Sequence, residues 1–258
     1  MADQQPDIHN ATAPVVVLVH GAFADGSSWN EVIARLQAKG LTVVSVQNPL
    51  SSLADDVAAV NRAVQAQARP VVLVGHSWGG TVITQAGATD KVAALVYIAA
   101  FAPDLGESTS DVQKNLPPPP YVSLLQADSG GFLRLPAQAM TQYFAQDISA
   151  AQSRVLAATQ GPIRGSAFAD KVTVAAWHSK PSWYLVTEQD RMIYPQLQRE
   201  MAARMNAQVS SVRASHVPFM SMPKETTAII LDAVEKVRAP HVASYPQLDI
   251  HRWFAVGK

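Results

Sequence analysis

The chain has 258 residues, of which 48% are hydrophobic and 16% are charged, a composition typical of a compact enzyme rather than a disordered chain. Basic and acidic residues number 20 each, so the net charge is zero and the basic excess of a typical nucleic-acid binder is absent. Cysteine is also absent, which excludes disulfides and a cysteine nucleophile.

Strand and helix patterns alternate along the first hundred residues. Val15 to Val19 is a β-branched run that ends at His20-Gly21 and predicts a buried strand. The spacing of apolar residues then predicts a helix over 28–39, a strand over 41–46, a helix over 52–68, a strand over 71–74, a helix over 79–88 and a strand over 92–99. This alternation indicates an α/β fold, a mostly parallel sheet with helices on both faces.

The alternation stops between residues 103 and 178. This segment contains four successive prolines, a Gly-Gly pair and several short helical patterns, but no convincing strand, so we expect a helical cap inserted over one end of the sheet. The alternation resumes with a strand over 182–187, a helix over 195–206, a strand over 208–213 and a helix over 224–237. We expect a single domain over 1–258 that consists of a core (14–102 and 179–238), a cap (103–178) and a C-terminal tail without a clear pattern (239–258).

Gly75-His76-Ser77-Trp78-Gly79 matches the pattern Gly-x-Ser-x-Gly, between a predicted strand and a predicted helix. Such a turn is tight and holds the serine in a strained backbone conformation. A side chain at position 75 or 79 would collide with the neighbouring helix or strand, which explains the two glycines. Because the turn lifts the Ser77 hydroxyl clear of the backbone, we predict that Ser77 is a nucleophile. The alternative is an ordinary glycine-rich turn between a strand and a helix.

A second turn, at residues 20–23, follows the first predicted strand. The carboxyl ends of parallel strands meet at one edge of the sheet, so this turn can aim the N–H of Ala22 at an oxyanion that forms beside Ser77. The N–H of Trp78, the residue after the nucleophile, is the second predicted donor. The alternative is a plain turn at the end of a strand. We interpret His20 as structural.

A serine hydroxyl becomes an effective nucleophile only when a base removes its proton. Of seven histidines, His216 lies between a predicted strand and the last long helix, and it fits the chain order of serine, acid and histidine. We predict that His216 is the general base. His76 is expected to point away from the turn, which leaves it without this role.

The acid of a triad is expected after the strand over 182–187, where two carboxylates qualify. Asp190 opens a turn toward the next helix, and we predict that it orients the imidazole of His216. Glu188 is still close to the strand end and is the alternative there. Asp104, after the strand over 92–99, is a weaker alternative from a neighbouring strand end.

These motifs together resemble the α/β-hydrolase superfamily, in particular the branch of plant methylesterases, plant hydroxynitrile lyases and their bacterial relatives. The resemblance covers about residues 14–237 and rests on Val-His-Gly-Ala-Phe at 19–23, Gly-His-Ser-Trp-Gly-Gly at 75–80, Gln-Asp-Arg-Met-Ile at 189–193 and Ser-His at 215–216. It implies a triad and two oxyanion donors formed by Ser77, Asp190, His216, Ala22 and Trp78.

Two positions depart from the lyases of this branch. Those lyases place a threonine after the first-strand histidine and a lysine directly after the catalytic histidine, whereas this chain has Gly21 and Val217. Both departures favour the esterases. Residues 103–178 carry six acidic and five basic side chains without a cluster suited to a charged ligand, which favours a neutral substrate.

The sequence therefore predicts a serine hydrolase that uses no cofactor or metal and cleaves a small, neutral carboxylic ester through an acyl-enzyme. The alternatives are lyase or oxygenase chemistry on the same scaffold and a non-catalytic ligand binder, against which the intact Ser, Asp and His set argues. We expect neither a nucleic-acid nor a membrane partner, and the sequence predicts no oligomeric state. Without a signal-peptide pattern the expected location is cytoplasmic, although a periplasmic protein whose signal has been removed would look the same.

Overall fold

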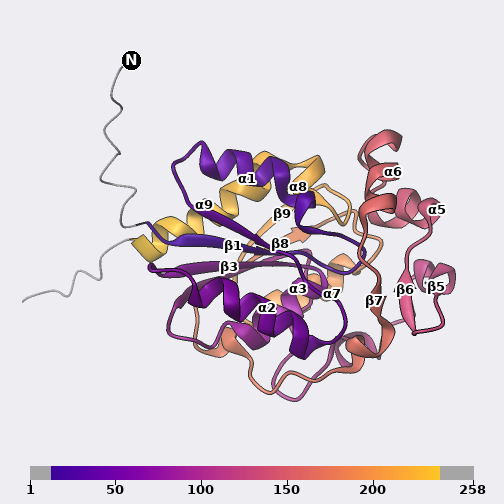
Figure 1. The fold of residues 1–258 in the computed structure, drawn as a ribbon, viewed down its shortest axis with the longest axis horizontal. Helices are drawn as coiled ribbons and strands as arrows, with labels where there is room; N and C mark the ends of the chain where they lie inside the picture. The colour runs from indigo at the N-terminus through magenta and orange to yellow at the C-terminus, as the bar shows by residue number, and fades with distance from the viewer. Residues whose placement is uncertain (1–12, 239–258) are drawn as a thin grey trace, which may run out of the picture.

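A computed structural model describes residues 13–238, and its central feature is a six-stranded parallel sheet (Figure 1). In spatial order its strands are β2 (Val43–Val46), β1 (Val15–Val19), β3 (Val71–His76), β4 (Val92–Ile98), β8 (Ser182–Thr187) and β9 (Gln208–Val212). The predicted parallel sheet is therefore confirmed. The expected tail over 239–258 lies outside the described residues.

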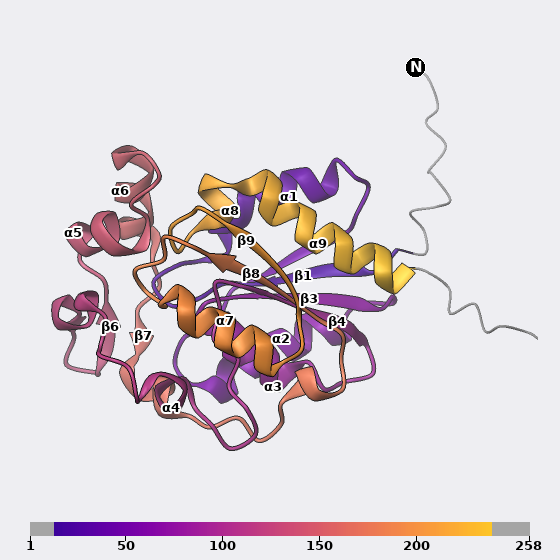
Figure 2. The same cartoon turned by 180° about the vertical axis from the view of Figure 1, so that it is seen from behind.

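Helices cover both faces of the sheet, as the alternation predicts (Figures 1 and 2). One face carries α1 (Asn30–Gln37), α8 (Pro218–Ser221) and α9 (Pro223–Arg238), and the other carries α2 (Leu53–Gln65), α3 (Trp78–Ala86) and α7 (Pro195–Arg204). Every residue of β1, β3 and β8 is buried, because both faces of these strands are covered. Within residues 13–238, no helix is long and apolar enough to cross a bilayer.

The segment between β4 and β8 lies beside the carboxyl ends of the strands (Figures 1 and 2). Its helices are α4 (Thr109–Gln113), α5 (Ala137–Ala139) and α6 (Ala150–Thr159). It also contains 3-10 turns over 120–124, 165–169 and 176–178 and a π-helical turn over 140–144.

The expectation that this segment contains no strand is wrong. The strands β5 (Gln126–Ala127), β6 (Phe132–Arg134) and β7 (Ile163–Arg164) pair as a small antiparallel sheet. They have two or three residues each, which is too short for an alternating pattern to appear in the sequence.

The chain order places a switch point between β1 and β3. From β1 the chain moves outward to β2 and then returns to the other side of β1 with β3. In open parallel sheets, ligand sites form at the carboxyl ends of the strands at such a point. Val19 is paired with Gly75, so the turns that follow β1 and β3 leave the sheet at the same level. The turn at residues 20–23 is therefore placed next to the one that carries Ser77.

Close backbone contacts hold the turn after β3 in place. A Cβ at position 75 would lie 2.5 Å from the carbonyl oxygen of Gly79, and a Cβ at position 79 would lie 2.4 Å from the carbonyl oxygen of Val19. Both neighbours are backbone atoms of regular elements, which cannot move aside. The glycines thus allow α3 to start directly against β3 and β1.

We expect Gly79→Ala to lower the free energy of unfolding by about 1–3 kcal/mol, because overpacking a rigid site costs that much. Helix propensity alone would act in the opposite direction by about 1 kcal/mol. Urea denaturation measures the difference.

The matched control is Gly130→Ala, in the exposed turn between β5 and β6. There the nearest atom to an added Cβ is a side-chain oxygen of Asp128 at 3.3 Å, and the stability should stay within about 0.5 kcal/mol of wild type. An equally stable Gly79→Ala protein would contradict the rigid contact with Val19.

Candidate active site

Ser77 lies between β3 and α3 in a strained backbone conformation, with φ 52° and ψ −122°. A non-glycine residue in such a region costs on the order of 1–3 kcal/mol and persists only where the surroundings impose it. Here the carbonyl oxygen of Ser77 accepts hydrogen bonds from the N–H groups of Gly80 at 2.9 Å and Phe101 at 3.1 Å. Within residues 13–238 the Ser77 hydroxyl has no hydrogen-bond partner, so it is available for another contact.

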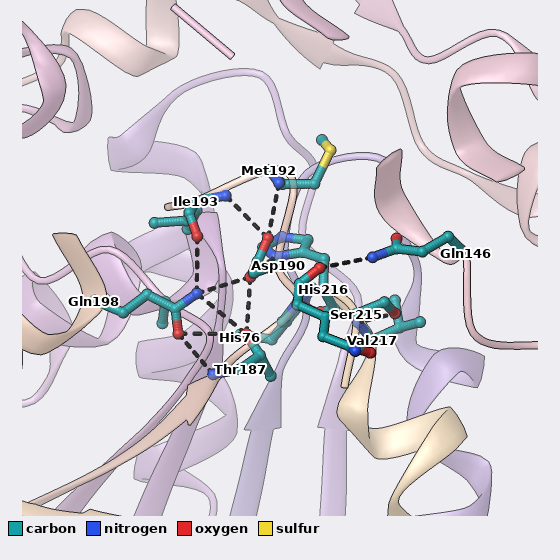
Figure 3. A network of polar contacts seen from close by, with 12 residues as sticks. His76, Gln146, Thr187, Asp190, Met192, Ile193, Gln198, Ser215, His216 and Val217 are labelled. Carbon is teal, nitrogen blue, oxygen red and sulfur yellow. Dashed lines mark hydrogen bonds and ion pairs between the residues drawn. The ribbon is translucent and has the colours of Figure 1, made fainter. Parts of the chain in front are cut away.

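Asp190 lies in the turn after β8 and is almost fully buried. Its Oδ2 lies 2.7 Å from Nδ1 of His216 (Figure 3). The other donors to the carboxylate are the N–H groups of Met192 at 2.7 Å and Ile193 at 3.0 Å, the Thr187 hydroxyl at 2.9 Å and the Gln198 amide at 2.8 Å. A buried carboxylate is tolerable only with such a set of donors.

His216 is buried in the loop between β9 and α8. A carboxylate can only accept, so in the neutral ring Nδ1 carries the proton and Nε2 is the bare nitrogen. Nε2 makes no hydrogen bond to any residue in the described part of the chain. In the neutral ring His216 thus has an acceptor nitrogen that is available to a hydroxyl donor.

The loops that carry Asp190 and His216 are fastened to the segment between β4 and β8. The N–H of Ser215 donates to Asp147 at 2.7 Å, and the side chain of Gln146 donates to the carbonyl of Gln189 at 2.7 Å. Figure 3 shows Gln146 reaching the turn beside Asp190 from the opposite side to Gln198. The positions of Asp190 and His216 therefore depend on this segment.

The turns that meet at Ser77 contain two backbone N–H groups without partners in the described part of the chain, those of Trp78 and Ala22. Trp78 is the first residue of α3, where N–H groups have no partner inside the helix. Gly21 packs against the serine so closely that a Cβ there would lie 2.7 Å from the Cβ of Ser77, and Ala22 follows it directly. Neither the Ala22 nor the Trp78 N–H has a hydrogen-bond partner among residues 13–238, so both are free to bind an anion.

A buried carboxylate that the sequence analysis missed holds the side chain of Trp78. The indole Nε1 donates to Asp56 of α2 at 2.7 Å, and the N–H of Leu50 donates to the other oxygen at 2.7 Å. Burial raises the pKa of Asp56 to about 6, although both hydrogen bonds act in the opposite direction. The available signal was the position of Asp56 on the apolar stripe of its helix, three residues after Leu53 and four before Val60.

His76 is also placed differently from expectation. Its side chain does not avoid the site: its Nε2 lies 2.8 Å from the backbone carbonyl oxygen of His216. Strand alternation fixes which face of a sheet a residue occupies but not what it meets there, so the sequence carried no signal for this contact.

The other titratable residues considered from the sequence lie outside this cluster. Nε2 of His20 accepts from the N–H of Asn48 at 2.9 Å, and its Nδ1 donates to the carbonyl of Gly21 at 2.9 Å. Glu188 pairs with Arg199, and Asp104 pairs with His178 at 2.7 Å. No group of three or more His, Asp or Glu side chains within the described ranges is arranged to hold a metal ion.

Comparisons with known proteins find a matching family profile, similar sequences and similar folds. A sequence profile described as the alpha/beta hydrolase family matches residues 16–229. A Phoma sp. protein named a probable hydrolase is 26% identical over 86% of this chain and 98% of its own length. The pyrethroid hydrolase of Sphingobium wenxiniae is 27% identical over 86% of this chain and 88% of its own length. The crystal structure of polyneuridine aldehyde esterase matches with a TM-score of 0.76 at 19% identity, covering 85% of this chain and 98% of that one, and so has the same fold.

We expect the melting temperature of Asp56→Asn to rise relative to that of wild type as the pH is raised from 5 to 8. A carboxyl whose folded-state pKa is raised from 3.8 to about 6 costs the wild-type protein about 3 kcal/mol of stability once it is fully ionised, and about 1.4 kcal/mol of this is lost between pH 5 and pH 8. Asparagine does not titrate, and its weaker hydrogen bonding affects both pH values equally. Calorimetric melting of both proteins at the two pH values is the measurement.

The control is Asp55→Asn, one residue earlier and exposed, where the hydroxyls of Ser51 and Ser52 lower the pKa. Asp55 is ionised at both pH values, so the pH-dependent change should be much smaller for this variant, limited to the loss of the minor upward effect of the Asp55 charge on the pKa of Asp56. An equally small change for Asp56→Asn would show that the pKa of Asp56 is not raised into this range.

Proposed function

We propose that this chain, which belongs to the alpha/beta hydrolase family, is a serine hydrolase that cleaves small, neutral carboxylic esters through an acyl-enzyme. The contact of 2.7 Å between Asp190 and His216, at the same sheet edge as the strained Ser77, is the observation that carries the proposal. The names of two of its matches, a pyrethroid hydrolase and an esterase, are consistent with ester cleavage.

In this mechanism Ser77 Oγ attacks the acyl carbon while Nε2 of His216 takes the hydroxyl proton. The carbonyl oxygen becomes an oxyanion that accepts from the N–H groups of Ala22 and Trp78, and removing one such donor typically costs about 3–4 kcal/mol of barrier lowering. His216 then gives its proton to the leaving alcohol. Water attacks the acyl-Ser77 carbon by the same proton path and releases the acid.

Asp190 has two roles in this scheme. Its Oδ2 accepts from Nδ1 of His216, which keeps Nε2 free of a proton in the resting state. Its negative charge also stabilises the imidazolium that forms when His216 takes the proton of Ser77. The donors from Met192, Ile193, Thr187 and Gln198 hold the carboxylate in the one orientation that serves both roles.

We assign residues 103–178 the role of a cap that shapes the substrate site. Phe144 of this segment packs edge-on against the His216 ring with centroids 5.1 Å apart, and Phe168 packs edge-on against Trp78 at 5.6 Å. The cap thus packs apolar rings against the side chains of His216 and Trp78. A neutral ester fits such surroundings, whereas a charged one would lose hydration without gaining a counter-charge.

Hydrolysis is favoured over cyanohydrin cleavage by two positions. A side chain in place of Gly21 would meet the Cβ of Ser77 at 2.7 Å, so this site has no room for a hydroxyl-bearing residue there. Val217, directly after His216, is fully buried and apolar and supplies no cation for a leaving cyanide. A ligand binder or an oxygenase on this scaffold would not form a covalent acyl-serine, which the following experiment examines.

We expect Ser77→Ala to lower kcat for p-nitrophenyl acetate by at least about 10³-fold, because the nucleophile is lost while the fold remains. Mass spectrometry of quenched wild-type protein should show an added acetyl group on the peptide that contains Ser77. Ser210→Ala, on the exposed edge strand β9, is the control and should behave as wild type. Turnover by Ser77→Ala above about a tenth of wild type would refute the proposed nucleophile.

We expect Asp190→Asn to lower kcat by up to about 10⁴-fold, because an amide that donates to Nδ1 holds the wrong imidazole tautomer. Glu188→Gln, two residues earlier, removes only a surface pair with Arg199 and should stay within about twofold of wild type. Steady-state kinetics of both variants at pH 8 compares them. A crippled Glu188→Gln beside an active Asp190→Asn would reverse the assignment of the acid.

A further inference from the structure

The imidazole of His76 is completely buried directly before Ser77 and lies against the ring of His216 (Figure 3). The two ring centroids are 4.6 Å apart with an angle of 53° between the planes. Nε2 of His76 lies 2.8 Å from the backbone carbonyl oxygen of His216. A carbonyl only accepts, so this nitrogen carries the proton and Nδ1 is bare. Nδ1 is buried without a hydrogen-bond partner among residues 13–238.

The surroundings of His76 keep its ring neutral. Phe219 packs edge-on at 4.7 Å, and Trp29 and Phe144 pack edge-on at 6.3 and 6.2 Å between centroids. Burial among these rings lowers the pKa of His76 well below 6.5. The titratable groups that act on it, His216 and His20, both disfavour a positive charge on it, and its ring makes no ion pair with a described carboxylate.

His76 connects two residues that lie far apart along the sheet. Ser77 follows β3 and His216 follows β9, and two strands, β4 and β8, lie between them. Because no hydrogen bond joins the two side chains within residues 13–238, another contact must set their separation. His76 is the covalent neighbour of Ser77 and donates to the main chain of His216, so it connects the two loops directly.

We propose that His76 is a positioning residue that fixes the general base relative to the nucleophile. Its Nε2–H holds the backbone of His216, and its ring limits the tilt of the His216 imidazole. The His76 ring must be neutral in this role, because a positive charge on it would oppose the imidazolium that His216 becomes during attack. The proposal rests on the proposed function, since it assigns His76 its role through His216.

The first test compares His76→Phe, which keeps a flat ring without the donor, with His76→Gln, whose amide nitrogen can take the place of Nε2. For p-nitrophenyl acetate we expect His76→Phe to lower kcat about 10- to 100-fold with KM within twofold, since small misplacements of a reacting group have effects of this size. His76→Gln should recover at least a third of the wild-type kcat. Val72→Ala, a buried change in the same strand, should reduce stability and leave kcat within twofold.

Wild-type kcat in a folded His76→Phe protein would overturn the proposal, as would a His76→Gln protein no faster than His76→Phe. Neither result would change the effect of Ser77→Ala, so failure of this proposal is distinguishable from failure of the proposed function.

The second test needs no variant at this position. In the ¹⁵N-labelled wild-type protein, ring-nitrogen chemical shifts should identify His76 as a neutral imidazole with its proton on Nε2 throughout pH 5.5–8.5. A proton on Nδ1, or protonation of both nitrogens within this range, would overturn the proposal even if His76→Phe failed to fold.

Discussion

The buried contact between Asp190 and His216 is the constraint on which the rest of the site depends. Burying a carboxylate is unfavourable unless donors surround it, and here the donors come from the end of β8, the turn after it and helix α7. A donor from His216 completes the set and draws in the loop between β9 and α8. The end of β8, the start of α7 and the loop between β9 and α8 are thereby fixed by the solvation of one charge.

Ser77, the proposed nucleophile, depends on a different constraint, the close approach of backbones at the switch point between β1 and β3. Glycines at positions 21, 75 and 79 leave no room for a Cβ, and this brings two strand ends and the start of α3 together. Ser77 is thereby held at a positive φ. The same approach brings the turn that contains Gly21 against Ser77, so the strain at Ser77 and the position of the two N–H groups that we propose as oxyanion donors have one origin. Asp56 and His76 then connect this rigid turn to α2 and to the His216 loop.

Much of this architecture could be predicted from the sequence because it follows from periodicity and turn chemistry. The runs such as Val15–Val19 and the glycine pattern around Ser77 are local signals, and the parallel sheet they predict is the one observed. The small sheet of β5, β6 and β7 could not be predicted, because its strands are too short to show a period and β7 pairs with β6 from a distant segment. Asp56 and His76 were missed for a related reason: their partners are set by tertiary contacts, which a single sequence does not record. The roles assigned to Ser77, Asp190 and His216 remain predictions that the geometry supports.

The central claim is that Ser77, His216 and the two N–H groups act on one acyl centre. A crystal structure of the protein after reaction with an alkyl fluorophosphonate measures this directly. We predict phosphorus bonded to Oγ of Ser77, with one phosphonyl oxygen 2.7–3.1 Å from the backbone nitrogens of both Ala22 and Trp78, the distances expected for an oxyanion hole. Phosphorus on another residue, or a phosphonyl oxygen that contacts neither nitrogen, would contradict the account.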